Sequence, residues 1–284
     1  MKVRTSAEAE KFLSRLAPQY IRFCPELDRE VTIVPEKSVL RHLQPAFRLD
    51  ELVREDDEPA LSSAIAELVA RSGLAQADLG VTGSFLVGAQ EASSDIDLVV
   101  YGLSNYRRVL DALGECVSHG VFSRLDRRDL ARLYRKRVSD PSSYSFQEFV
   151  WHESRKGDRA KFGNRRFDVL SARRPEEIDG RFGDVSFKRL GRARATCVVT
   201  DDELAHDYPA RYGVSGCQAL GVEVSEIVSF THTYANQVRR GERAICHGIL
   251  ERVSGAEPHF RILIGSSREA PGEFLKVARE DRRS

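Results

Sequence analysis

Two apolar runs joined through a glycine-serine turn constrain the fold of this 284-residue chain more than any other feature. Residues 79–84 read LGVTGS and residues 96–101 read IDLVVY. Short apolar runs of this kind, rich in β-branched residues, are typical of strands that are buried inside a sheet. We therefore expect a sheet in which one strand ends at the Gly-Ser turn and the next begins at an acidic pair.

Helical patterns surround these two runs. Apolar residues at helical spacing predict helices over residues 7–16, 59–74 and 105–119, and further helices are expected over residues 85–92, 126–138 and 145–151. Two more strands are expected, at residues 30–34 and at residues 166–171, which read RFDVLS. This mixture predicts an α+β fold, in which a small mixed sheet is flanked by helices.

The pattern changes beyond Gly183. Short apolar runs, separated by Gly, Asp and Pro, occur at residues 195–199, 222–228, 244–253 and 260–264. Runs of this length and spacing predict a β-rich C-terminal domain, and the length of the chain favours roughly two domains. We predict an N-terminal extension over residues 1–58 that packs on the core, a core over residues 59–185 and the β-rich domain over residues 186–284.

Several protein classes are excluded by what the chain lacks. It has no stretch of about 18 apolar residues, so no membrane span is expected, and residues 1–16 carry charges that do not fit a signal peptide. The five cysteines form no C-x-x-C pair, so free buried thiols are expected rather than zinc ligands. No Walker motif, G-x-S-x-G or H-x-x-x-H occurs. We therefore expect a cytoplasmic protein with no membrane partner.

The near-neutral net charge of +1 hides a basic block. Residues 121–195 contain 20 Lys or Arg against 11 Asp or Glu, a net charge of +9. Blocks of this kind often contact phosphate groups. The alternative is an ordinary solvated helix face with ion pairs one turn apart.

An acidic pair marks the start of the second apolar run. Asp95 and Asp97 are two positions apart, so on a strand they project from the same face. Each carboxylate disfavours ionisation of the other, and a divalent cation with a preference for oxygen ligands, such as Mg²⁺, resolves this conflict. The Gly83-Ser84 turn, which precedes the acidic pair, could bind phosphate beside such a metal site. Gly83 lets the backbone approach a phosphate closely, and the Ser84 hydroxyl can bond a phosphate oxygen.

The order of these features resembles the DNA polymerase beta-like nucleotidyltransferase superfamily. The shared pattern is Gly83-Ser84, a gap of about ten residues, and then Asp95, an apolar residue and Asp97, and the resemblance covers about residues 59–172. The family places a third carboxylate on a later strand of the same sheet, and Asp168 in the run at 166–171 stands at the matching position. The resemblance implies a minimal nucleotidyltransferase core.

The resemblance also implies roles for these residues. The three aspartates would bind Mg²⁺ or Mn²⁺, and Asp168 would help to deprotonate an acceptor hydroxyl. Gly83 and Ser84 would hold the nucleotide's β- and γ-phosphates. Arg159 and Lys161, which precede the third strand, are candidates for further phosphate contacts.

The implied activity is that of an enzyme that moves a nucleoside monophosphate from an NTP, with ATP expected, to an acceptor hydroxyl and releases pyrophosphate. The basic block favours RNA or DNA as the acceptor. Two alternatives remain open. One is a non-catalytic nucleic-acid-binding or regulatory protein on the same fold, and the other is an adenylyltransferase that acts on a small molecule or a protein.

Overall fold

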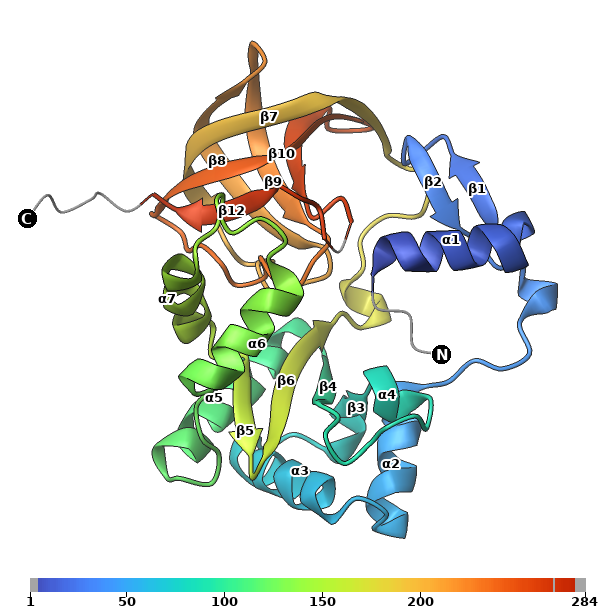
Figure 1. The fold of residues 1–284 in the computed structure, drawn as a ribbon, viewed down its shortest axis with the longest axis vertical. Coiled ribbons are helices and arrows are strands. Elements are labelled where there is room, and N and C mark those ends of the chain that lie inside the picture. Colours follow the sequence, from blue (N-terminus) through green and yellow to red (C-terminus); the bar gives the residue numbers. More distant parts are fainter. Residues whose placement is uncertain (1–4, 268, 279–284) are drawn as a thin grey trace, which may run out of the picture. The chain divides into compact units, whose positions relative to one another are not determined.

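The computed structural model describes residues 5–267 and 269–278 (Figure 1). The described chain divides into two units. The core unit consists of Arg41–Arg132 and Glu153–Asp179, and the barrel unit comes from the ranges Met1–Leu40, Leu133–His152 and Gly180–Ser284. Two helices, α6 (Arg127–Arg137) and α7 (Phe146–Lys156), contain residues of both units.

The core unit is built on a four-stranded mixed sheet. Its strands are β3 (Leu79–Val81), β4 (Ile96–Tyr101), β5 (Arg159–Phe162) and β6 (Arg165–Ala172), and they lie in the order β3-β4-β6-β5. The central pair, β4 and β6, is parallel, whereas β3–β4 and β5–β6 are antiparallel. This confirms the small mixed sheet that the sequence predicts, with β4 at the predicted residues.

Helices cover the sheet of the core unit. They are α2 (Pro45–Glu55), α3 (Pro59–Ser72), the single turn α4 (Gly83–Leu86) and α5 (Leu103–Ser118), with 3₁₀ turns at η3 (Gln76–Asp78) and η4 (Pro175–Glu177). The buried side chains of α3 and α5 form one apolar core with those of β4 and β6. Helix α3 ends where Gly73 adopts a left-handed conformation with φ of 64°, which matches the expected stop.

The barrel unit contains the six remaining long strands. They are β7 (Ser186–Asp201), β8 (Ala210–Ala219), β9 (Val222–Ser229), β10 (Arg243–Ser254), β11 (His259–Ile264) and β12 (Phe274–Val277). Strand β11 pairs with both β9 and β10, so the order β11-β9-β8-β7-β10 closes on itself. Closure pairs the strand edges, and it confirms the predicted β-rich C-terminal region.

The N-terminal segment consists of α1 (Ser6–Leu16), η1 (Pro18–Tyr20), a hairpin of β1 (Ile21–Cys24) and β2 (Arg29–Thr32), and η2 (Glu36–Ser38). The hairpin turn bonds to the start of β7, where Phe187 N donates to Glu26 O at 2.7 Å and Arg189 N donates to Asp28 at 3.0 Å. The first 40 residues therefore group with the barrel unit. The predicted extension over residues 1–58 is divided, since α2 belongs to the core unit.

Two local expectations differ from the structure. The helix expected over residues 85–92 is replaced by the single turn α4, and Gly88 follows with a left-handed φ of 65° that no regular helix continues. The basic block at 121–195 is shared between the two units, because residues 133–152 and 180–195 belong to the barrel unit. All five cysteines are free and buried, as expected. Within the described residues, no helix is both long enough and apolar enough to cross a bilayer.

Candidate active site

The sheet of the core unit brings two of the three predicted aspartates together. Asp97 on β4 lies directly opposite Asp168 on β6 in the parallel register. Asp95 stands two residues before Asp97, immediately before β4 begins. The Asp95 side chain is 32% exposed and that of Asp168 is 6% exposed, so the acidic face runs from the surface into the protein.

The Gly-Ser turn lies against this acidic face. Thr82 N donates to Asp97 O at 2.9 Å, which extends the β3–β4 pairing up to the turn. Gly83 has a φ of 62°, and the space that a Cβ atom would occupy there is filled by the Asp97 carboxylate. Glycine is therefore required at position 83 both for its conformation and for the close approach. The half-buried Ser84 follows in the one-turn helix α4.

Arg166 is the residue that links the outer and inner aspartates. Its Nη2 bonds Asp95 and its Nε donates to Asp168 Oδ1 at 2.9 Å. Arg166 and Asp168 are two positions apart on β6, so they share one face of the strand. One guanidinium thus bonds two of the three carboxylates.

Arg159 packs beneath Asp168 rather than facing solvent. The two residues are paired across β5 and β6, and Arg159 Nε lies 3.6 Å from Asp168 Oδ2. The Arg159 Nη1 atom bonds Glu153 at 2.5 Å and Asp158 at 3.1 Å, and its side chain is 6% exposed. These contacts make Arg159 a candidate positioning residue for Asp168.

The cluster below Arg159 is ionic and buried. Lys156 Nζ donates to Glu153 Oε1 at 2.6 Å, with the Lys156 side chain 0% exposed. Burial lowers the pKa of Lys156 and raises the pKa of Asp158, because the charged form of each loses its hydration. Such a network restricts the positions that Asp168 can adopt.

Lys161, the second basic candidate, forms ion pairs on the edge strand β5. Its Nζ lies 3.0 Å from Asp129 and 3.9 Å from Asp126. Lys161 is on the same face of β5 as Arg159, since they are two residues apart. Its described contacts hold the loop before α6 to the sheet.

Two further arginines approach the Gly-Ser turn, and the sequence did not single out their roles. Arg48 on α2 donates from Nε to Phe85 O at 3.2 Å. The Arg165 guanidinium lies 5.7 Å from the centre of the Phe85 ring and pairs with Glu58 at 2.8 Å. Arg48 lies outside the predicted core range and about 35 residues before the turn, so no local spacing could have connected them.

The aspartates fit a hard divalent cation by ligand type, and two of them, Asp97 and Asp168, are paired on adjacent strands, with Asp95 just before β4. Their side chains are not arranged as a ligand set: within the described residues, no group of three His, Cys, Asp or Glu side chains is placed to hold a metal ion. Arg166 explains the difference, because it binds Asp95 and Asp168. Ion binding would therefore require the Arg166 guanidinium to move.

Comparison with known proteins places the chain in a family. A protein of Methanocaldococcus jannaschii, described as uncharacterized protein MJ1086, is 32% identical over 294 residues, which cover 98% of this chain and 83% of the relative. The chain belongs to the MJ1086 family. No family model and no solved structure matches it significantly. The similarity to MJ1086 spans both units, so the core unit and the barrel unit are shared by the two proteins.

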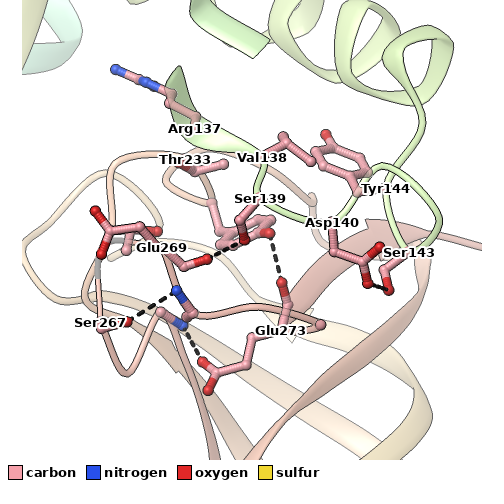
Figure 2. Close-up of a pocket in the computed structure, with 15 residues that line it drawn as sticks. Arg137, Val138, Ser139, Asp140, Ser143, Tyr144, Thr233, Ser267, Glu269 and Glu273 are labelled. Carbon is pink, nitrogen blue, oxygen red and sulfur yellow. Dashed lines mark hydrogen bonds between the residues drawn. The ribbon is translucent and has the colours of Figure 1, made fainter. Parts of the chain in front are cut away.

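A small polar pocket lies in the barrel unit of this MJ1086-family protein (Figure 2). Its volume of about 20 Å³ has room for one water molecule. The Glu273 carboxylate accepts bonds from Gly265 N at 2.8 Å and Ser266 N at 2.9 Å, while Ser139 donates to Glu269 O. These groups bind one another, so we interpret the pocket as a packing contact between loops of the barrel unit rather than as a binding site.

A row of exposed cations lies on the outside of the barrel. This basic row consists of Lys188, Arg192 and Arg194 on β7 and Arg243 and Arg252 on β10. Lys188 and Arg252 are directly opposite in the β7–β10 register. Like charges that face each other across strands destabilise a sheet, and an anionic partner would remove that cost. Lys188 also pairs with Asp28 at 3.1 Å.

Proposed function

We propose that the protein is a metal-dependent nucleotidyltransferase. The supporting observation is the pairing of Asp97 with Asp168 on adjacent parallel strands, with the Asp97 carboxylate seated against Gly83. Two residues that are 71 positions apart in the sequence are thus neighbours in the sheet, which supports the proposal. The buried thiols fit the cytoplasmic setting that we also propose.

Asp95, Asp97 and Asp168 would hold Mg²⁺ or Mn²⁺, which would neutralise the triphosphate and lower the pKa of the attacking hydroxyl. The Gly83-Ser84 turn would contact the β- and γ-phosphates of the NTP, with ATP as the proposed donor. Asp168 would accept the proton of the acceptor hydroxyl, held in place by Arg159. The acceptor oxygen bonds the α-phosphorus while the bond between that phosphorus and the bridging oxygen breaks, and pyrophosphate leaves.

Arg166 has a place in this scheme. In the described state it holds Asp95 and Asp168 and so limits repulsion between the carboxylates. When the ion and triphosphate bind, its guanidinium would be released from the aspartates. A planar guanidinium suits phosphate oxygens as well as carboxylates, so Arg166 can exchange one anion for the other.

The proposed acceptor is a nucleic acid. The basic row supports this choice, because it offers five exposed cations on one side of the barrel unit. Replacing Arg192, Arg194 and Arg243 by Gln should weaken RNA or DNA binding and reduce its salt dependence. A matched control replaces three exposed arginines outside the basic block, Arg15, Arg41 and Arg54, by Gln.

A second candidate function is a non-catalytic nucleic-acid-binding protein on the same fold. The bonds from Arg166 to Asp95 and Asp168 favour it, because they occupy oxygens that catalysis needs. The two candidates differ in how they respond to loss of an aspartate. Catalysis requires the Asp97 carboxylate, whereas simple binding of an anion would be unchanged or improved without it.

The deciding experiment measures nucleotide transfer. The purified protein is incubated with each α-labelled NTP, Mg²⁺ or Mn²⁺, and separate pools of RNA, DNA ends, protein and small molecules. Asp97→Asn is the test variant, and Asp111→Asn, at an exposed position of α5, is the matched control. Label transferred by the wild type and the control but not by Asp97→Asn supports the transferase. No transfer to any pool, with nucleic-acid binding equal in all three proteins, supports the second candidate.

A further inference from the structure

A larger cavity lies at the outer edge of the sheet in the core unit. Its volume is about 330 Å³, which is in the range of small-molecule sites. The second half of α5, the chain around Leu125, the end of α7 and the start of β5 form its walls. Strand β5 is the edge strand of the sheet, so the cavity lies beyond the pairing of β5 with β6.

The lining of this cavity contains both apolar and cationic side chains. The apolar side chains are those of Leu113, Val117, Leu125 and Leu130. The cations are Arg124, Arg155 and Arg159, and the one acid among the lining residues is Glu153. Glu153 already binds Lys156 at 2.6 Å and Arg159 at 2.5 Å. The lining therefore favours a molecule with an apolar body and an anionic group.

A glycine in the wall is the second observation that points to a ligand. Gly114 lies inside the 16-residue helix α5, where glycine is among the poorest helix formers. A Cβ atom at Gly114 would meet no atom within 4 Å, so packing does not require glycine there. The missing side chain leaves the wall of the cavity open. Gly157, between α7 and β5, also lines the cavity and has open space where a Cβ would stand.

We propose that this cavity is a binding site for a small amphipathic organic anion. Its apolar body would rest on Leu113, Val117 and the neighbouring leucines, close to the backbone at Gly114, and its anionic group would pair with Arg124 and Arg155. The inference goes beyond the transfer reaction and does not depend on it. Arg159 lines this cavity and also contacts Asp168, so the test must separate the cavity from the nucleotide site.

The test uses 8-anilinonaphthalene-1-sulfonate, a fluorescent probe with an apolar body and one sulfonate, titrated into the full chain. Gly114→Phe places an aromatic ring in the cavity and should weaken binding at least about ten-fold, because the ring would occupy space that the probe needs. Gly114→Ala is the matched control and should bind the probe within about two-fold of the wild type, since a methyl group there meets open space. Circular dichroism and melting temperature show whether each variant is folded.

The charge of the ligand is tested separately. A double variant, Arg124→Gln with Arg155→Gln, should weaken binding of the sulfonate probe about ten-fold and leave binding of the uncharged N-phenyl-1-naphthylamine unchanged. This variant also decides the question if Gly114→Phe does not fold. Sulfonate binding that is unaffected by the double variant, or by a folded Gly114→Phe, would overturn the proposal. Displacement of the probe by ATP with Mg²⁺ would also overturn it, since the cavity would then belong to the nucleotide site.

Discussion

Replacing Gly83 by Ala tests the contact that supports the proposed active site. The chain offers a matched control, because Gly83 and Gly88 have left-handed φ values of 62° and 65°. A left-handed conformation costs an alanine about 1 to 2 kcal/mol relative to glycine. The two sites differ in their surroundings: a Cβ at Gly83 would overlap the Asp97 carboxylate, and a Cβ at Gly88 would meet nothing within 4 Å.

The expected magnitudes follow from this difference. Gly88→Ala should lower the free energy of unfolding by about 1 to 2 kcal/mol through backbone strain alone. Gly83→Ala carries the same strain and an overpacking cost. Because the Asp97 side chain is short and its carboxylate can rotate away, we take the lower end of that cost, about 1 kcal/mol. The total for Gly83→Ala is then about 2 to 3 kcal/mol.

The functional effect should be larger than the effect on stability. Moving the Asp97 carboxylate removes an oxygen ligand and opens the Gly-Ser turn, so transfer should fall at least about 100-fold in Gly83→Ala. Gly88→Ala should keep transfer within about three-fold of the wild type. Urea denaturation measures the stability of both variants, and the α-labelled NTP assay measures transfer. Equal losses of stability and equal activities in the two variants would refute the proposed contact.

Three further predictions concern single side chains. Asp168→Asn should abolish any rise in melting temperature produced by Mg²⁺ and lower transfer at least about 100-fold. The control Asp111→Asn should have neither effect. A Mg²⁺-dependent rise in melting temperature that survives in Asp168→Asn would contradict the ligand role. Lys156→Met should lower the free energy of unfolding by about 3 kcal/mol, because it removes a buried partner of Glu153. The double variant with Glu153→Gln should recover part of this free energy, as measured by urea denaturation. Burial raises the pKa of Glu148, but the hydrogen bonds from Lys276 and Ser145 together lower it by more. The folded pKa of Glu148 therefore lies below the ordinary 4.5. Wild type should therefore be more stable than Glu148→Gln at pH 7, and the difference should disappear as the pH falls from 4.5 through the folded pKa. A difference in urea midpoint that does not shrink as the pH falls below 4.5 would show that the charge is not its source.

Local patterns were sufficient for several elements of the core unit, but not for β5 or α2. The apolar run at Ile96 and the helical spacing after Pro59 depend on which faces are buried, and β4 and α3 follow these patterns closely. The turn at Gly83 and the strand that contains Asp168 are also local features. The predicted helices did not include α2, although Leu49, Leu52 and Val53 fall at helical spacing. Its place beside β3 comes from packing against Gly80, whose missing side chain leaves room for the backbone of Pro45.

The sequence by itself determined which groups could form a site: two aspartates on one face of a strand, a glycine-serine turn before them and a third aspartate on a later strand. It did not determine how their charges are balanced. Only the tertiary structure shows that Arg166 binds Asp95 and Asp168 and that Arg159 lies beneath Asp168 with Glu153 and Asp158. The physical reason is that side-chain periodicity depends on neighbours along the chain, whereas the partner of a charge depends on strand register and burial, which bring residues about 70 positions apart into contact.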